Sequence, residues 1–294
     1  MYIGRFAPSP TGPLHYGSLI AALASYLDAR SSSGQWLVRI ENTDPLREVP
    51  ESCHLILQTL EAFGFEWDGK VVWQHLQHDI YQAALDDLLT KDTAYYCNCS
   101  RKQIMQRHHS SRYDNYCRER HNTSSPAAIR FKAPHSDQIN AHVKWHDDIQ
   151  GDVISPNSDD FILKRKDNLW AYQLAVVADD IEAHVTHVVR GSDLLHETPK
   201  QMLLQSALGA ATPHYAHIPI ATSPSGQKLS KQNFAKAINT EDSSVLLVEA
   251  LVFLNQIVDP EWSGASSRQI LQWAIRNWDI SRIPHLLAQP RHSG

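Results

Sequence analysis

The sequence predicts an α/β fold with a parallel sheet of Rossmann type, an inserted subdomain and a short helical C-terminal region. Short apolar strands alternate with helical patterns along much of the chain, which is typical of βαβ units. The 294 residues are 42% hydrophobic and 20% charged, an ordinary globular composition that can bury a sizeable core. We divide the chain into residues 1–226, which carry an insertion at about 95–160, and residues 227–294.

The first unit is the stretch RFAPSPTGPLHYGSLIAALASYL, which starts at Arg5. Residues 2–6 are predicted to form a strand, and the three prolines that follow make a stiff loop. Apolar residues recur at helical spacing from Leu19. The N-terminus of such a helix favours an anion such as phosphate, to which His15 can donate while Gly17 allows close approach. An ordinary strand-to-helix connection is the alternative, but it leaves this density of proline, histidine and glycine unexplained.

The later elements follow from the same patterns. The sequence predicts strands at 36–40, 161–165 and 185–189, a strand within TAYYCNCS, helices at 51–63, 79–89 and 198–208, and a buried segment at 171–178. Thr198 is expected to cap the last helix, with Pro199 at its first position and Gly209 as its stop. Between residues 101 and 160 the periodicity weakens, which indicates the inserted subdomain.

Polar residues stand where the predicted strands end. They are Arg5, Ser9, Glu41, Asp44, Arg190 and Asp193, with Tyr172 in the buried segment before the last strand. Ligands of open parallel sheets bind beyond the carboxyl ends of the strands, so these side chains are expected to converge. Arginines can clamp a carboxylate and Glu41 can hold an ammonium group, which suits a small zwitterion. Taken singly, each residue is equally explained as a solvated surface group.

A second feature is the stretch SPSGQKLSKQN, residues 223–233. Its proline, serine and glycine predict a mobile loop, on which Lys228 and Lys231 could close over a triphosphate and stabilise charge that develops at phosphorus. On its own, a lysine-rich loop is more often a solvated surface.

Together the two features resemble the HIGH and KMSKS motifs of class I aminoacyl-tRNA synthetases, and RFAPSPTGPLH and RIENTD resemble the glutamyl branch. The last histidine of HIGH is Ser18 here, and Leu229 and Gln232 replace two KMSKS residues. The resemblance implies catalytic roles for His15, Lys228 and Lys231. It also implies an ATP site at Pro8, His15, Gly17, Ser18, Lys228 and Lys231, with Mg²⁺ accompanying the nucleotide. The L-glutamate site that it implies is Arg5, Phe6, Ala7, Pro8, Ser9, Glu41, Tyr172 and Arg190.

Only 63 residues follow Lys231, too few for the anticodon-binding region of a full glutamyl-tRNA synthetase. The chain therefore resembles the truncated glutamyl-Q tRNA(Asp) synthetases. That family implies ATP-dependent activation of L-glutamate without tRNA, then transfer to queuosine in the anticodon of tRNA(Asp). Two alternatives stay open: glutamylation of a tRNA 3′ end, and a non-catalytic tRNA-binding paralogue.

Three cysteines within the insertion suggest one structural zinc ion. Cys97, Cys99 and Cys117 lie within about twenty residues, although the usual CxxC spacing is absent. Three packed, reduced cysteines are the alternative. The fourth ligand is open among His108, His109 and His121 on the residues alone, whereas the family resemblance points to Tyr113.

The net charge of −5 predicts that any nucleic-acid contact uses a local basic patch. The candidates in the insertion are Arg101, Lys102, Arg107, Arg112, Arg118 and Arg120. The sequence has neither a run of about 18 apolar residues nor a secretory signal pattern, and its four cysteines do not suggest a disulfide framework. We therefore expect a cytoplasmic protein that does not contact a membrane, and a monomer.

Overall fold

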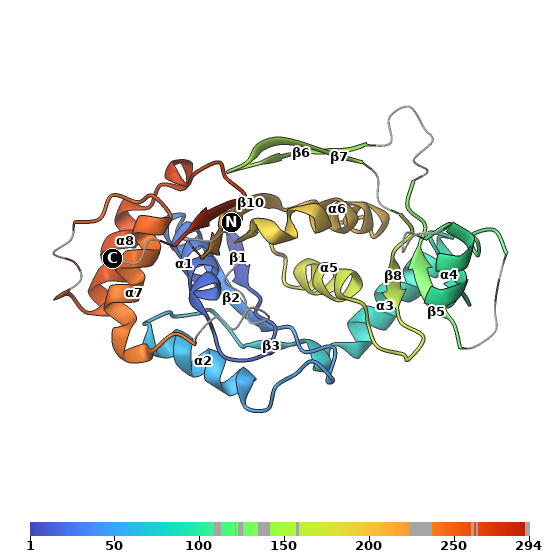
Figure 1. The fold of residues 1–294 in the computed structure, drawn as a ribbon, viewed down its shortest axis with the longest axis horizontal. Helices are drawn as coiled ribbons and strands as arrows, with labels where there is room; N and C mark the ends of the chain where they lie inside the picture. Colours follow the sequence, from blue (N-terminus) through green and yellow to red (C-terminus); the bar gives the residue numbers. More distant parts are fainter. Residues whose placement is uncertain are drawn as a thin grey trace.

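The computed structural model describes residues 1–108, 113–120, 122, 126–134, 142–156, 159–223, 237–259, 262 and 264–291 (Figure 1). Lys228 and Lys231 lie outside the described residues, as do Arg112, His109 and His121. The molecule is elongated, with a helical region at one end, parallel strands in the middle and a small antiparallel sheet at the other end (Figure 1).

Parallel strands form the centre of the molecule. One sheet has the order β1 (Ile3–Phe6), β2 (Gln35–Ile40), β3 (Val72–Trp73), all parallel. A second has the order β7 (Gly151–Pro156), β6 (His142–Asp147), β10 (His214–Ile218), β9 (His187–Gly191). β10 runs parallel to both of its neighbours, and β6 and β7 form an antiparallel hairpin. Just before β9, the Thr186 N–H donates to the Ile3 carbonyl at 2.9 Å, which joins the two sheets. The predicted α/β fold with a parallel sheet is confirmed.

Helices alternate with these strands. They are α1 (Tyr16–Ser31), α2 (Ser52–Ala62), α3 (His78–Thr90), α5 (Tyr172–Glu182) and α6 (Thr198–Ala207), with 3-10 turns η1 (Gln74–Leu76) and η2 (Ser192–Glu197). Among the described helices, α1 and α5 are the most deeply buried: α1 packs on the parallel strands, and α5 packs on α3 and α6. Gly64 follows the C-cap of α2 and terminates the helix, and its φ of +84° suits a residue without a side chain.

The antiparallel end, which we call the distal module, has the sheet order β4 (Ala94–Cys97), β5 (Ala128–Phe131), β8 (Ile162–Lys164), with α4 (Arg101–His108) beside it. The β6–β7 hairpin also falls within the predicted insertion, yet Asp147 of β6 pairs with Tyr215 of β10 in the central sheet. The insertion is thus interleaved with the core in space, and its predicted boundaries stay a prediction.

The opposite end contains α7 (Ser243–Phe253), α8 (Ser267–Asn277) and the pair β11 (Ile220–Thr222) and β12 (Ala288–Pro290), with 3-10 turns η4 (Thr240–Asp242) and η6 (Ile280–Arg282). Both helices pack against the cluster around α1. In the described part of the chain, every helix is too short or too polar to cross a membrane.

One predicted helix cap is wrong. Thr198 is the first residue of α6, with a helical φ of −55°, and Glu197 occupies the cap position. The Thr198 hydroxyl accepts a hydrogen bond from Nη2 of Arg190 at 2.8 Å instead of serving the helix backbone. A tertiary contact to a buried guanidinium therefore overrides the local capping preference of threonine.

Candidate active site

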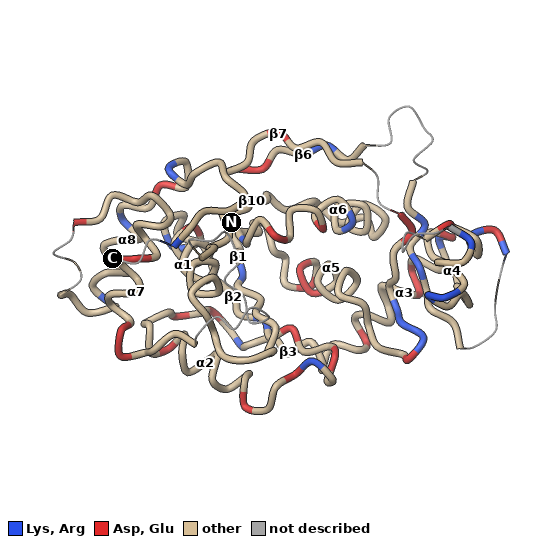
Figure 2. Tube along the Cα trace, viewed as in Figure 1, with Lys and Arg blue, Asp and Glu red and all other residues tan. Residues whose placement is uncertain are grey.

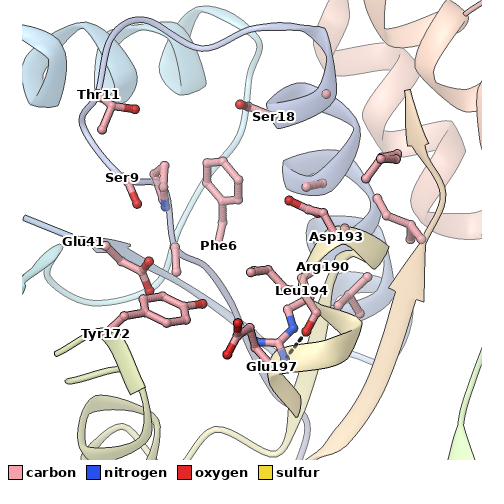
Figure 3. Close-up of a pocket in the computed structure, with 18 of the residues that line it drawn as sticks. Phe6, Ser9, Thr11, Ser18, Glu41, Tyr172, Arg190, Asp193, Leu194 and Glu197 are labelled. Atoms are coloured by element: carbon pink, nitrogen blue, oxygen red, sulfur yellow. Dashed lines mark hydrogen bonds between the residues drawn. The ribbon is translucent and has the colours of Figure 1, made fainter. Parts of the chain in front are cut away.

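A cavity of about 860 Å³ opens at the carboxyl ends of β1, β2 and β9 (Figure 3). It brings together eleven residues that the sequence analysis predicted: Arg5, Phe6, Ala7, Pro8, Ser9, His15, Gly17, Ser18, Glu41, Tyr172 and Arg190. Asp193 also lines it, whereas Asp44 does not and instead pairs with Arg165 at 2.8 Å. The convergence at one sheet edge follows from the parallel arrangement of the strands.

The N-terminus of α1 forms one wall of the cavity. His15 is the N-cap of this helix, and its Nδ1 accepts a hydrogen bond from the Ser18 N–H at 3.2 Å. A ring that accepts at Nδ1 carries its proton at Nε2 in the neutral form, so Nε2 is the donor. The helix N-terminus and this imidazole together suit an anionic group such as a phosphate.

Both ends of the segment that contains Lys228 and Lys231 lie beside this wall. Ile220 and Ala221, before the segment, line the cavity. After it, Ala237 forms a β-bridge with His15, and the Ile238 N–H donates to the Leu14 carbonyl at 3.1 Å.

A buried charged network underlies the cavity floor. Asp180 of α5 accepts hydrogen bonds from Nε and Nη2 of Arg5, at 3.3 and 3.4 Å, and from Nη1 of Arg39, at 2.5 Å. Nη2 of Arg39 also donates to Glu41 at 3.3 Å. Asp179 accepts from Tyr81 and from Gln74, the latter at 2.7 Å. Because the arginines are buried with acidic partners, the network fixes their side chains before any ligand binds.

Burial and charge act in opposite directions on these carboxylates. Burial alone would raise the pKa of Asp180, but Arg39 and Arg5 hold that pKa below its usual range. For Glu41, burial prevails over the same two arginines, and its pKa is raised. Burial and the nearby Glu41 raise the pKa of Tyr172 to about 12, so its hydroxyl stays protonated.

Arg190 at the end of β9 donates three hydrogen bonds. Its Nε donates to Nε2 of His217 at 3.0 Å, and its Nη2 donates to the hydroxyl of Thr198 at 2.8 Å and to the Leu194 carbonyl at 3.4 Å. Behind it, Nδ1 of His217 is hydrogen-bonded to Oδ2 of Asp147 at 2.5 Å. Burial lowers the pKa of His217 and Arg190 lowers it further against the effect of Asp147, which favours a neutral ring.

The residues behind the cavity wall were not predicted from the sequence: Arg39, Asp147, Asp179, Asp180, Thr198 and His217. A signal existed for two of them, since the adjacent acids Asp179 and Asp180 follow directly on an apolar run of the helix. Acids in such a helix need partners. His217 gave no comparable signal, because a single histidine in a strand is common.

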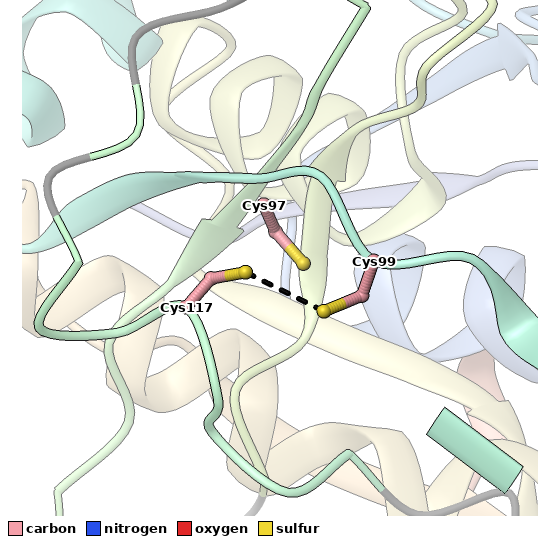
Figure 4. Close-up of side chains that lie close together, drawn as sticks. All are labelled: Cys97, Cys99 and Cys117. Carbon is pink, nitrogen blue, oxygen red and sulfur yellow. Dashed lines mark hydrogen bonds between the residues drawn. The ribbon is translucent and has the colours of Figure 1, made fainter. Parts of the chain in front are cut away.

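The three predicted metal ligands meet in the distal module (Figure 4). The sulfur atoms of Cys97, Cys99 and Cys117 all lie within 4.8 Å of one another, and those of Cys99 and Cys117 are 3.4 Å apart. Two sulfurs bound tetrahedrally to one zinc ion would be separated by about 3.8 Å. The Tyr113 hydroxyl is 3.3 Å from the sulfur of Cys97 and accepts from the Cys117 N–H at 2.9 Å. The donor set and its closeness therefore fit a zinc ion.

Comparison with known proteins agrees with the fold. The family described as tRNA synthetases class I (E and Q), catalytic domain, matches residues 3–274. The glutamyl-Q tRNA(Asp) synthetase of Vibrio vulnificus is 45% identical over 288 residues, which cover 97% of this chain and 92% of the relative. The protein of the same name from Escherichia coli is 45% identical over 286 residues, covering 96% and 91%.

A crystal structure of glutamate-tRNA synthetase from Elizabethkingia anophelis is similar in fold, with a TM-score of 0.82 and 25% identity. The match covers 98% of this chain and 68% of that one.

The fold and the cavity thus define the catalytic domain of a class I tRNA synthetase, and the chain belongs to that family, in the group marked E and Q. Within the family, the two relatives named above, which match it over more than nine-tenths of their length, are glutamyl-Q tRNA(Asp) synthetases. The resemblance found in the sequence motifs is confirmed.

Proposed function

We propose that the chain activates L-glutamate with ATP, without any tRNA, and transfers the glutamyl group to queuosine in the anticodon of tRNA(Asp). The chain is a ligase of the aminoacyl-tRNA synthetase type. The observation that carries the proposal is the single cavity lined by both arginines, Glu41 and the α1 N-terminus. The names of the relatives, which span nearly the same length, support the choice of substrate and acceptor.

In the first step, an α-carboxylate oxygen of glutamate bonds to the α-phosphorus of ATP, and the bond to pyrophosphate breaks. Arg5 and Arg190 hold the carboxylates of glutamate, Glu41 holds its ammonium group, and the other glutamate contacts are Phe6, Ala7, Pro8, Ser9 and Tyr172. His15, Gly17, Ser18 and Pro8 hold the nucleotide, which carries Mg²⁺. Lys228 and Lys231 stabilise the charge that develops at phosphorus. These residues act by positioning and by electrostatic stabilisation, and we assign no general base.

In the second step, a hydroxyl of the queuosine ring attacks the activated carbonyl and AMP leaves. Proteins read RNA mainly at single-stranded loops whose bases are splayed out, so an anticodon loop can present its modified base to the cavity. Within the distal module, Cys97, Cys99, Cys117 and Tyr113 would hold a structural zinc ion, which would fix the fold of that module. A cytoplasmic location and a monomeric state stay predictions.

Labelled glutamate offered with three RNAs tests this function. The RNAs are tRNA(Asp) that carries queuosine, the same tRNA without queuosine, and tRNA(Glu). We expect glutamate-dependent ATP–pyrophosphate exchange without RNA, then label on queuosine-containing tRNA(Asp) alone. Label on tRNA(Glu), or equal label on both forms of tRNA(Asp), would reject the queuosine acceptor and favour 3′-end glutamylation. No exchange at all would favour a non-catalytic tRNA-binding protein.

A further inference from the structure

In the absence of substrate, two of the three nitrogen atoms of the Arg190 guanidinium already donate hydrogen bonds within the protein. The residue is 6% exposed, although it lines the cavity. Its Nε and Nη2 are occupied by His217, Thr198 and the Leu194 carbonyl. Its Nη1 is buried without a hydrogen-bond partner among the described residues. A buried cationic N–H group without a hydrogen-bond partner is destabilising. We therefore expect a ligand carboxylate to accept a hydrogen bond from Nη1.

His217 can serve Arg190 in only one tautomer. Because Arg190 donates from Nε, Nε2 of His217 must carry a lone pair, and the ring proton must lie on Nδ1. That proton points at Oδ2 of Asp147, 2.5 Å away. Both residues have 0% exposure, so no solvent competes for these hydrogen bonds.

Asp147 is itself fixed by the backbone. Its other oxygen, Oδ1, accepts from three backbone N–H groups: Ile149 at 3.1 Å, Gln150 at 2.9 Å and His217 at 3.0 Å. The two oxygens therefore have separate tasks. Oδ1 holds the turn between β6 and β7 against β10, and Oδ2 sets the tautomer of His217.

We propose that Asp147 and His217 are positioning residues, which lock the guanidinium of Arg190 so that Nη1 meets the carboxylate of the amino-acid substrate at one fixed depth. This inference rests on the proposed function, in which Arg190 binds glutamate. A locked guanidinium cannot follow the shorter side chain of aspartate, whereas a loose one can. The pair therefore supports both the affinity for glutamate and its selection over aspartate.

Asp147→Asn separates the two tasks of Asp147. Asparagine can keep its oxygen at the Oδ1 position for the three backbone N–H groups, and its amide N–H then points at His217. His217 must accept at Nδ1, so its proton moves to Nε2 and faces the N–H of Arg190. We expect the KM for glutamate to rise about tenfold or more, with the KM for ATP and the Tm nearly unchanged. The preference for glutamate over aspartate should fall.

His217→Gln and His217→Met form the matched pair. The two replacements have similar size and shape, but only glutamine offers an oxygen that can accept from Nε of Arg190. Glutamine should therefore retain most of the glutamate affinity, and methionine should raise the KM as strongly as Asp147→Asn does. Histidine ring ¹⁵N shifts should report the Nδ1–H tautomer in the parent protein and the Nε2–H tautomer in Asp147→Asn.

All variants are assayed by ATP–pyrophosphate exchange beside the parent protein and Arg190→Ala. If the parent shows no glutamate-dependent exchange, or if Arg190→Ala leaves the KM for glutamate unchanged, the proposed function or its use of Arg190 is wrong. If Arg190→Ala raises this KM but Asp147→Asn does not, the positioning role is wrong. Equal effects of glutamine and methionine at position 217, or parallel losses in both KM values and Tm, would likewise overturn it.

Discussion

Glu41 combines burial with a position beside Tyr172 in the cavity (Figure 3). Its side chain is only 9% exposed, and its one described ion pair is to Arg39 at 3.3 Å. Burial disfavours the carboxylate and raises its pKa from the usual 4.5, although Arg39 and Arg5 act against that rise. A substrate ammonium group would therefore add a cation to a carboxylate that its surroundings leave only partly compensated.

This environment predicts an acid limb in the activity profile. As the pH falls through the raised pKa of Glu41, the carboxylate is protonated and loses its attraction for an ammonium group. As the pH is lowered, we expect kcat/KM for glutamate in ATP–pyrophosphate exchange to decrease. This decrease should begin at a pH above the pKa of about 4.3 of an ordinary glutamate side chain. Glu41→Gln should raise the KM for glutamate about tenfold or more at neutral pH and abolish this limb. The same limb in both proteins would contradict the assignment.

At this scale, the sequence indicated the groups that face the cavity but not those that hold them. Arg5, Glu41 and Arg190 could be predicted because they stand at strand ends. Arg39 lies within β2, where alternation predicts only that it faces the other side from its neighbours. Asp147 is 70 residues away from the His217 that it supports, and a hydrogen bond over that distance leaves no local pattern.

Among the elements, β4 and α4 contribute residues to a small core that contains the cysteines. The apolar members of this cluster are Tyr95, Cys97, Ile104, Tyr113 and Cys117. The strands of the distal module also pack on α3 and α5 through a separate apolar cluster. The small cluster at the cysteines supplies little hydrophobic stabilisation of its own, so a metal ion would stabilise mainly the segment that carries them. Arg107 donates from Nη2 to the sulfur of Cys99 at 3.3 Å, which suits a sulfur that carries negative charge.

We therefore expect about one zinc ion per chain in protein prepared without chelator. Cys99→Ser should lose the metal and lower the Tm, because the site loses a thiolate that zinc prefers. Cys53→Ser is the matched control, since Cys53 lies outside the cluster and contacts Glu48 at 3.1 Å. Elemental analysis measures the zinc content of both variants, and thermal unfolding measures their Tm. The absence of zinc from the parent protein, or an equal loss of zinc from the Cys53 variant, would contradict the proposed zinc site.

The elements themselves were predicted unevenly. The sequence periodicity predicted β1, β2 and β9, and it placed both α2 and α3 within one residue of their ends. The strands β3 and β10 of the parallel sheets were not predicted. The β6–β7 hairpin falls in the stretch of weak periodicity, and its place is set by the pairing of Asp147 with Tyr215. Such a pairing between distant residues, like the contact of Thr198 with Arg190, is tertiary and has no local signature.

Over the whole molecule, we expect the modified base of the RNA to reach the cavity while the phosphate backbone contacts a second region. The cavity lies at the edge of the parallel strands, whereas the distal module extends to one end of the molecule (Figure 1). Lysines and arginines gather on and around α4, among several acidic residues (Figure 2). Arg101 and Lys102 of this helix are exposed, as the contact of a phosphate backbone requires. In a chain with a net charge of −5, a local patch of this kind is the expected route to RNA.

Charge reversal on the two ends of the molecule tests this division. Arg101→Glu with Lys102→Glu should leave ATP–pyrophosphate exchange unchanged, because neither residue lines the cavity. In the transfer assay the double variant should raise the KM for tRNA about tenfold or more, since it loses two phosphate contacts and repels the backbone. The dependence of log KM on log salt should also become shallower by about two.

The matched control is Arg268→Glu with Arg276→Glu, two exposed arginines of α8 at the opposite end of the molecule (Figure 1). It changes the net charge by the same amount, so any effect of overall charge on steering appears in both double variants. An unchanged KM for tRNA in the α8 variant and a raised one in the α4 variant would place the RNA on the distal module. Equal effects of the two would show that only the net charge matters, and a larger effect at α8 would place the RNA at the other end.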